Sequence, residues 1–387
     1  MDFLPRTQQE LVEIIQAASA DDVPLSVCGN GTKQGWGRAV SFERNVSLCG
    51  FSGIIDYAPA ELVLTAGAGT PLAEIKAALA AENQHLAFEP PDLGPLFGHA
   101  AEKATIGGVL ATNLSGPRRP FAGAARDFFL GFSGVNGRGE IVKAGGKVVK
   151  NVTGYDLPKL IAGSFGTLVA MTEITIKVVP APETSCSIIV DGLSPAAASQ
   201  MMTVALGSTA DPSAAAYLPS ASQAIFRLEG SGPSVVYRCQ VLTDLLRAPV
   251  RVVAAAESRD LWQSVRDLHS FRDNTSQILW LLSAPPAAFP GDIDALTRGL
   301  PDCSYLADWG GGRIWLAHAV TDIGEAVRAI RRYLGQGGHA TVIRAPEDWR
   351  QSDRVFAPDV PVALLRKVRA AFDPLRLFNR GRLHSDL

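Results

Sequence analysis

Short apolar runs and helical patterns of apolar residues follow one another along this chain, and glycine or proline stands at most of the joins. Apolar residues recur at helical spacing over positions 11–18 and predict an amphipathic helix, and the apolar run Leu25–Cys28 predicts a buried strand. Residues 45–60 predict two strands around a glycine-rich turn, and residues 61–67 predict another strand. This order of elements indicates an α+β fold with short connections.

A second helix is predicted directly after Gly69. Thr70 is a residue type that favours the N-cap, Pro71 suits the first helical position, and the apolar residues that follow share one face. We therefore expect Thr70 to cap a helix that ends near Asn83.

The next segment combines small residues with a hairpin signal. Residues 105–113 predict a helix that opens with paired glycines, residues 121–127 a loop, and residues 128–132 with 141–144 a hairpin across the turn at 136–139. A short helix at 158–162 and a strand at 169–179 follow. The prolines at 180 and 182 mark the first expected domain boundary.

Beyond this boundary the pattern falls into two similar halves. Residues 187–254 and residues 278–344 each alternate between strands and helices. The repetition predicts one split-βαβ sheet with helices on one face. A helix at 362–372 and a coil complete the chain. We expect a first domain over residues 1–180, an α+β domain over 181–350 and a C-terminal segment over 351–387.

Composition narrows the class of protein. With 387 residues, of which 47% are hydrophobic and 19% charged, the chain is long enough for two domains with sizeable cores. The formal net charge of -2 provides no electrostatic case for binding nucleic acid. No apolar run is long enough to span a bilayer, and no secretory signal pattern opens the chain. We expect a cytoplasmic protein that does not insert into a membrane and is at most peripheral on the inner membrane through partners.

The cysteines do not suggest a metal site. The five cysteines are far apart, and no two of them form a CxxC motif. We expect reduced thiols, with neither a zinc site nor an iron–sulfur cluster in this chain.

The glycine-rich stretch Gly29–Arg38 is the first candidate for chemistry. Four glycines within nine residues permit positive φ and a close approach of the backbone, and successive N–H groups in such a turn form a concave anion site. Lys33 and Arg38 add positive charge, so a phosphate or pyrophosphate is the natural ligand. The same residues also fit a surface turn between two strands. The stretch matches neither the P-loop nor the GxGxxG turn before a helix.

The predicted helix at 105–113 is the second candidate. Gly107 and Gly108 stand at its beginning, and a helix N-terminus without bulky side chains accepts an anion or a flat ring closely. Tight packing of the helix against a neighbour would require the same small residues.

Several motifs occur in a characteristic order, and their order and spacing together are more specific than any one of them. They are Gly29–Lys33, Pro90–Asp92, Thr105–Gly108 with Asn113, Lys150–Leu157, Gly163–Leu168, Thr172–Thr175, Phe372–Pro374 and Phe378–Asn379. The chain resembles, over nearly its whole length, the vanillyl-alcohol-oxidase or PCMH-type family of FAD-dependent oxidoreductases. The resemblance implies a PCMH-type FAD-binding domain, a ferredoxin-like (split βαβ) cap domain, and a C-terminal segment that returns to the FAD domain.

The resemblance also implies a set of cofactor-binding residues. The FAD pyrophosphate would be held by Gly29, Asn30, Gly31, Thr32 and Lys33. The ribityl and isoalloxazine part would be lined by Pro91, Asp92, Thr105, Gly107, Gly108 and Asn113. The adenine end would be enclosed by Asp127, Gly166, Ile174 and Thr175. Asn379 would return from the C-terminus towards the flavin. Some relatives tether FAD to a histidine in the glycine loop, and this loop has none, so FAD is expected to be non-covalent.

The catalytic motifs of the family's D-2-hydroxy-acid dehydrogenases are missing. Those enzymes carry GHxGDGN and EHGxG-like segments, and none of the six histidines here lies in such a motif. His99 belongs to the flavin domain, whereas His318 and His339 fit structural roles. Removing the hydroxyl proton of a 2-hydroxy acid requires a base within hydrogen-bond reach. We therefore assign no catalytic residue from the sequence.

The segment Asp308–Trp315 has two interpretations. Its glycines would let Arg313 approach the flavin and pair with a substrate carboxylate. The alternative is a hairpin turn with two packed tryptophans, which we favour.

Within the family, the chain looks most like the FAD-binding second subunit of bacterial glycolate oxidase. This implies a subunit of a complex that oxidises glycolate to glyoxylate, with hydride transfer in a larger FAD-binding catalytic subunit and onward electron transfer through an iron–sulfur subunit. The substrate would be a small 2-hydroxy acid. The alternatives are a self-sufficient FAD-dependent D-2-hydroxy-acid dehydrogenase and a non-redox scaffold subunit with a vestigial flavin site.

Overall fold

The computed structural model describes residues 1–147, 155–289, 291, 293–357 and 361–386. Part of the motif Lys150–Leu157 therefore lies outside the described residues. The chain divides into two compact units. Unit 1 comprises Met1–Ser115, Gly123–Ala181 and Pro361–Leu387, and unit 2 comprises Gly116–Ala122 and Pro182–Val360.

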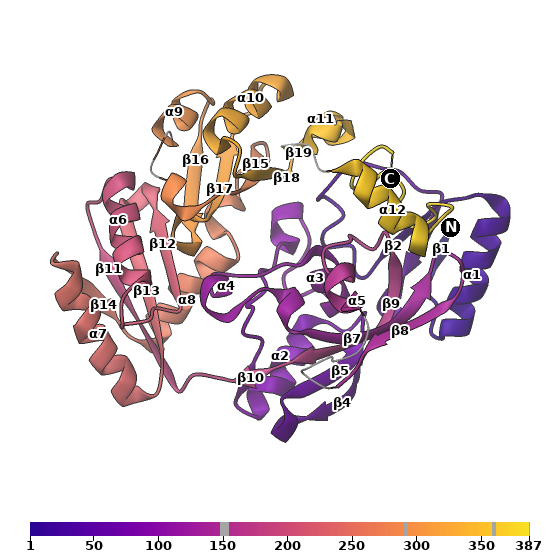
Figure 1. The fold of residues 1–387 in the computed structure, drawn as a ribbon, viewed down its shortest axis with the longest axis horizontal. Helices are drawn as coiled ribbons and strands as arrows, with labels where there is room; N and C mark the ends of the chain where they lie inside the picture. The colour runs from indigo at the N-terminus through magenta and orange to yellow at the C-terminus, as the bar shows by residue number, and fades with distance from the viewer. Residues whose placement is uncertain (148–154, 290, 292, 358–360, 387) are drawn as a thin grey trace. The chain divides into compact units, whose positions relative to one another are not determined.

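A five-stranded antiparallel sheet forms the centre of unit 1, in the order β4-β5-β9-β7-β8 (Figure 1). Its strands are β4 (Ile54–Ala58), β5 (Val63–Gly67), β7 (Phe129–Asn136), β8 (Ile141–Gly145) and β9 (Val169–Lys177). The same unit contains the helices α2 (Leu72–Ala81), α3 (Ile106–Thr112) and α5 (Leu157–Ile161). The predicted hairpin is confirmed, because β7 and β8 pair in antiparallel register up to Val135 and Ile141.

A smaller parallel sheet joins the two ends of the chain. Its order is β1-β3-β2, with β1 (Asp2–Phe3), β2 (Leu25–Cys28) and β3 (Arg44–Ser47). The predicted amphipathic helix is present as α1 (Gln8–Asp21), and its buried face packs in one cluster with Leu377 and Phe378. The backbone of the C-terminal segment hydrogen-bonds to Leu25, which accepts from the Asn379 amide at 2.9 Å. A separate pair, β6 (Gln84–His85) and β10 (Val179–Pro180), is antiparallel.

The helix after Gly69 begins one residue later than predicted. Pro71 is the N-cap of α2 and makes no side-chain cap. The buried Thr70 hydroxyl instead donates to the Gly67 carbonyl at 2.7 Å and accepts from the Gly53 amide at 2.9 Å. The expectation that Thr70 caps this helix was wrong, because a turn distant in sequence uses its hydroxyl.

Unit 2 contains one nine-stranded sheet in the order β14-β11-β13-β12-β16-β17-β15-β18-β19. Its strands are β11 (Thr184–Val190), β12 (Ala214–Leu218), β13 (Gln223–Gly230), β14 (Arg251–Val253), β15 (Ile278–Ser283), β16 (Ser304–Asp308), β17 (Arg313–His318), β18 (His339–Arg344) and β19 (Phe356–Ala357). The two predicted halves lie in one sheet, as expected, and meet edge to edge where Tyr217 of β12 pairs with Ala307 of β16. Each half had been predicted, but their fusion depends on this pairing between halves.

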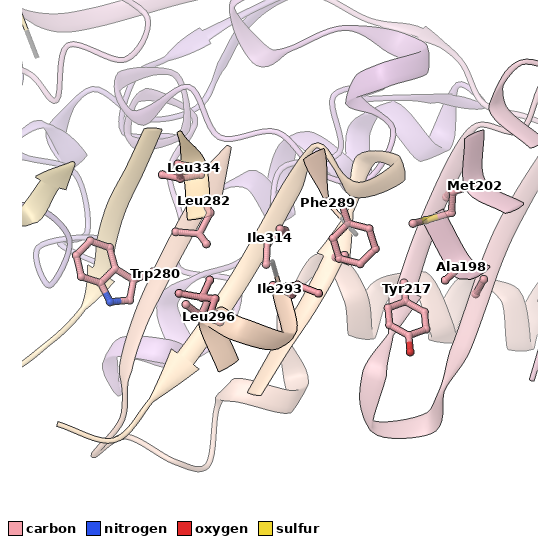
Figure 2. Close-up of a cluster of buried hydrophobic side chains, with 14 of the residues drawn as sticks. Ala198, Met202, Tyr217, Trp280, Leu282, Phe289, Ile293, Leu296, Ile314 and Leu334 are labelled. Carbon is pink, nitrogen blue, oxygen red and sulfur yellow. The ribbon is translucent and has the colours of Figure 1, made fainter. Parts of the chain in front are cut away.

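The helices of the two halves cover a shared apolar core. They are α6 (Pro195–Leu206), α7 (Gly232–Leu246), α9 (Ile293–Arg298) and α10 (Ile323–Leu334). Figure 2 shows Trp280 and Leu282 of β15 close to Ile293 and Leu296 of α9, all of them buried. The periodic apolar residues that predicted these helices are thus the residues that they bury.

A further helix corrects the expectation that helices lie on one face only. Trp262 of α8 (Ala255–Arg266) donates through its indole N–H to the Ser187 hydroxyl at 2.9 Å. Ser187 neighbours Ile188, which lies in the shared core, and successive residues of a strand point to opposite faces. α8 therefore packs on the face of β11 opposite to α6 and α7.

The remaining helices are short or terminal. They are α4 (Arg119–Ala122), α11 (Glu347–Gln351) and α12 (Val362–Phe372). Residues 121–127, predicted as a loop, include the end of α4 and a 3₁₀ turn at Ala125–Asp127. Across the described ranges, no helix combines the length and the apolar character needed to cross a membrane.

Candidate cofactor-binding site

The glycine loop after β2 touches the beginning of α3. A Cβ atom added to Gly29 would lie 2.4 Å from the Thr105 hydroxyl oxygen, so only glycine fits there without displacement. This hydroxyl caps α3 by accepting from the Gly108 amide at 3.2 Å. The absence of a side chain at position 29 thus brings the loop against the capped N-terminus of α3.

Two more glycines show equally close packing. A Cβ on Gly107 would lie 2.7 Å from the Ala68 carbonyl oxygen, and a Cβ on Gly35 would lie 2.3 Å from the Phe97 ring. The paired glycines of α3 therefore differ in role: Gly107 packs against the end of β5, whereas an added Cβ on Gly108 would approach the Lys33 ammonium at 3.5 Å. The packing interpretation holds for Gly107, and Gly108 leaves the backbone open towards Lys33.

Lys33 places a positive charge beside this helix end. Its ammonium donates to the Thr32 hydroxyl at 3.4 Å. The residue is half-buried, but the ammonium itself lies among protein atoms, and this burial lowers the pKa of Lys33 to about 8, with the Asp92 carboxylate acting in the opposite direction. A buried cation is stabilised by a nearby anion. The site therefore favours a negatively charged group close to Thr32, Lys33 and Gly108.

Asn30 and Asp92 shape the walls around the charge. The Asn30 amide donates to the Lys103 carbonyl at 3.0 Å and accepts from the Cys49 thiol at 3.0 Å. Asp92 accepts from the Gly94 amide at 3.2 Å and from the Glu102 amide at 2.6 Å, next to the buried Pro91. Both side chains hold backbone segments in place, a role that the sequence analysis had not anticipated.

A second group of predicted residues lies at the other end of α3. Asn113 ends the helix in a left-handed conformation, and its side-chain oxygen Oδ1 accepts from the Arg126 amide at 3.1 Å. Asp127 accepts from the Ala124 amide at 2.8 Å. The Phe165 amide donates to Ala111, which brings the Gly163–Leu168 loop to the same end of the helix.

Asn379 connects this loop to β2. Its carbonyl oxygen accepts from the Val27 amide at 2.9 Å, and its amide group donates to the carbonyls of Val27 at 3.1 Å and Phe165 at 2.8 Å. Gly166 has a positive φ of 67°, and a Cβ there would lie 3.0 Å from the side-chain amide nitrogen of Asn379. Asn379 of the C-terminal segment therefore joins β2 to the Gly163–Leu168 loop.

Replacing Asn379 with leucine is expected to destabilise unit 1 by on the order of 3 kcal/mol. The change leaves a buried N–H and buried carbonyls unpaired, each costing about 1–3 kcal/mol when no water replaces the partner. Thermal or denaturant unfolding measures the loss. The matched control is Asn83→Leu, because Asn83 also has positive φ but is exposed. Equal losses in both variants would contradict the assigned role of the Asn379 amide.

Ile174 and Thr175 form a third group, within β9. Ile174 is fully buried and pairs with Ala66 of β5 and Phe132 of β7. The Thr175 hydroxyl is 2.9 Å from the Thr65 hydroxyl. The structure thus places the sixteen predicted residues in three groups along α3 and the central sheet, and their assignment to parts of FAD stays a prediction.

Two buried polar groups near the glycine-rich loops were not identified from the sequence. None of the described residues offers a hydrogen-bond partner to the Trp36 indole N–H or to the Ser164 hydroxyl. The Trp36 ring packs edge-on against Phe165, with centroids 4.9 Å apart. Buried polar groups are nearly always hydrogen-bonded, so unpaired ones beside a glycine-lined loop indicate a ligand. Their positions within glycine-rich motifs were the available signal in the sequence. The close packing at the glycines, the Lys33 ammonium and these two hydrogen-bond donors fit a long, flat, anionic cofactor such as FAD.

His318 and Arg313 make ordinary structural contacts. The Trp280 indole donates to Nε2 of His318 at 3.0 Å, and Nδ1 of His318 lies 2.7 Å from the Ala319 carbonyl. Burial lowers the pKa of His318, which favours the neutral ring. Arg313 forms a buried ion pair with Asp308 at 2.5 Å and stacks over Trp309 at 3.9 Å. The segment forms the hairpin between β16 and β17, as favoured above.

The fold and this glycine-lined site define an FAD-binding protein of the PCMH type. Residues 1–145 match the sequence profile described as "FAD binding domain". A relative of this type also aligns with 98% of the chain. The chain belongs to the PCMH-type family of FAD-linked oxidoreductases.

The similarity to that relative extends over both units. The chain is 34% identical over 388 residues to the glycolate oxidase subunit GlcE of Escherichia coli (strain K12), covering 98% of each chain. It is 36% identical over 184 residues to a D-lactate dehydrogenase of Anaerostipes hadrus, covering 47% of this chain and 37% of the relative. The glycolate oxidase subunit GlcD of Bacillus subtilis (strain 168) is 34% identical over 181 residues, or 46% of this chain and 37% of that one.

Solved structures agree with the fold. The chain superposes on alkyldihydroxyacetonephosphate synthase with a TM-score of 0.68 at 16% sequence identity, covering 97% of this chain and 76% of that one. At this identity the likeness shows the shared fold alone.

Proposed function

We propose that this chain is the FAD-binding subunit of a complex that oxidises glycolate to glyoxylate. The observation that carries the proposal is the alignment with the glycolate oxidase subunit GlcE, which covers 98% of both chains and therefore includes unit 2 as well as the FAD-binding unit. The D-lactate dehydrogenase and GlcD similarities extend over less than half of this chain and support 2-hydroxy-acid chemistry more generally.

FAD supplies a two-electron acceptor in such a complex. In this chain, Lys33, Thr32 and the amides at the start of α3 would hold its pyrophosphate, and the Trp36 and Ser164 donors would reach its polar edge. Non-covalent binding is supported by Cys28, the cysteine next to the loop. Burial raises the pKa of the Cys28 thiol to about 11, so this residue is not a thiolate that attacks a flavin.

The larger flavin subunit would carry out the hydride transfer. Three histidines belong to the segments of unit 1, namely His85, His99 and His384. His85 lies in β6 with pairing to Val179, and His99 is exposed in the loop that Asp92 holds. A partner with its own base, followed by an iron–sulfur subunit, would complete the electron path, with the assembly peripheral on the inner membrane.

An anaerobic spectral titration tests the proposal. The FAD-loaded chain is mixed with glycolate or D-lactate, first alone and then with the partner flavin subunit. We expect the flavin of this chain to stay oxidised alone and to be reduced when the partner is present. The partner alone with glycolate is the control, because it gives the spectral change of its own flavin. Reduction of the isolated chain would favour a self-sufficient dehydrogenase, and failure to take up FAD would favour a scaffold.

A further inference from the structure

A short segment of the chain leaves unit 1 and returns to it. Residues Gly116–Ala122, which we call the strap, belong to unit 2, although the residues on either side belong to unit 1. The strap carries the sequence Gly-Pro-Arg-Arg-Pro-Phe-Ala and includes α4. No sequence pattern predicted this exchange between units.

Unit 2 holds the strap by buried polar contacts. Nε of Arg118 donates to Glu229 at 2.8 Å, and its terminal nitrogen makes a second, parallel contact with the same carboxylate. The two side chains are only 12% and 11% exposed. Bidentate contacts between arginine and a carboxylate fix orientation as well as distance. Arg118 is therefore held in one geometry on β13.

Trp309 makes the second attachment. Its indole N–H donates to the Gly116 carbonyl at 2.9 Å. The guanidinium groups of Arg119 and Arg313 lie on its ring, 4.4 Å and 3.9 Å from the ring centroid. Trp309 thus contacts both the backbone and a side chain of the strap, while Arg313 and Asp308 anchor Trp309 within the hairpin.

The two ends of the strap are joined to each other in unit 1. The Ser115 hydroxyl accepts from the Ala125 amide at 2.9 Å, and the Asn113 side chain accepts from the Arg126 amide at 3.1 Å. Asn113 ends α3, and Asp127 follows Arg126. The chain on each side of the strap therefore carries a proposed cofactor-binding residue. α3 has seven residues and spans about 10 Å, so a shift of its last residue also moves the glycines at its beginning.

We propose that unit 2 sets the geometry of the FAD site through the strap, with Arg118, Glu229 and Trp309 as positioning residues. The inference rests on the proposed FAD binding and adds to it a dependence on contacts that touch no cofactor. Loosening the strap releases Asn113 at the end of α3 and lets α3 move relative to the glycine loop.

The test compares FAD affinity among matched variants of the full chain. Trp309→Leu and Arg118→Gln are expected to raise the Kd for FAD by about 3- to 30-fold, the range measured for coupling between distant sites. They are also expected to change the visible circular dichroism of the bound flavin at saturating FAD. Trp309→Phe keeps an aromatic face for Arg119, so this variant should keep most of the wild-type affinity for FAD.

The matched control is Arg266→Gln. Arg266 also makes a bidentate contact with a carboxylate in unit 2, to Asp267 at 2.7 and 2.8 Å, and is 19% exposed. This variant should lose stability without changing the Kd or the dichroism. An equal rise of Kd in the control and the strap variants would overturn the inference, since general destabilisation would then explain it.

Hydrogen exchange on the wild-type chain provides a measurement that needs no variant. Coupling between two sites is reciprocal, so FAD should slow exchange of the strap amides in unit 2. Unchanged exchange with FAD bound, like an unchanged Kd in Trp309→Leu, would overturn the coupling and leave the proposed function intact. A wild-type chain that takes up no FAD would overturn both.

Discussion

Replacing Lys33 with methionine is expected to weaken FAD binding by about 10- to 100-fold and to stabilise the FAD-free protein. A hydrogen bond to a charged group is worth about 1.5–3 kcal/mol, which corresponds to this range of Kd. The opposite effect on the free protein follows from the burial of the ammonium group. Without an anion beside it, the charge opposes folding, and methionine fills similar volume without charge.

The pH dependence has a definite sign. Burial lowers the pKa of Lys33 from 10.5 to about 8 in the folded, FAD-free chain, against the influence of Asp92. Between these values the unfolded chain binds more protons, so the stability of the wild type rises with pH. Below about 8 the wild type carries the full penalty, on the order of 2 kcal/mol after allowing for the partial exposure of Lys33. FAD binding by the wild type should weaken as pH rises above about 8.

Isothermal titration of FAD and denaturant unfolding across this pH range measure both effects. Lys103→Met is the matched control, because the Lys103 carbonyl accepts from the side chain of Asn30 in the same loop, whereas Lys103 itself is exposed. The control should change neither the Kd nor its pH dependence. A Lys33→Met variant with wild-type affinity at every pH would remove Lys33 from the pyrophosphate site.

Replacing Glu229 with glutamine is expected to destabilise unit 2 by about 3–5 kcal/mol at neutral pH. Glu229 is 11% exposed. It forms ion pairs with Arg118 and Arg227 and accepts a hydrogen bond from the Ser213 hydroxyl. Removing one charge from a buried ion network leaves the other charges uncompensated, which is the costly case. Glutamine preserves the shape of the side chain, so the loss of stability measures the contribution of the negative charge.

This loss depends on pH. Burial alone would raise the pKa of Glu229, but Arg227, Arg118 and Ser213 together lower it from 4.5 to about 2. A carboxylate with a depressed pKa stabilises the folded state fully above the unfolded value. The difference between wild type and Glu229→Gln should therefore be constant above about 4.5 and shrink as pH falls towards about 2.

Tryptophan fluorescence during denaturant unfolding is a suitable probe. Five of the six tryptophans lie in the segments of unit 2, and only Trp36 lies in unit 1. The control is Glu257→Gln, which breaks an exposed ion pair with Arg251 and should cost less than about 1 kcal/mol. A pH-independent loss in Glu229→Gln would argue that shape, not charge, holds this network.

Much of the candidate site could be read from residue types over short distances. Gly29 stood out as part of a glycine-rich loop and Gly107 as one of two glycines that open a helix, and the structure shows the close approaches that these glycines permit. The cap at Thr105, which the sequence analysis did not propose, is also a local feature, because the Thr105 hydroxyl and the Gly108 amide lie within four residues. Thr70 has the same local signal, but its hydroxyl accepts from the Gly53 amide, 17 residues away in the chain, so the local rule failed.

The sequence by itself determined the succession of helices and strands, the glycine loop with its lysine, and the two similar halves after the boundary near residue 180. These features depend on periodicity, turn residues and caps, which act over a few residues. Only the tertiary structure decided that β12 and β16 join the halves, that Asn379 fastens β2 to the Gly163–Leu168 loop, and that Arg118 finds Glu229. Each of these pairs residues far apart in the chain, where no local propensity specifies the partner and the balance of burial and hydrogen bonding does.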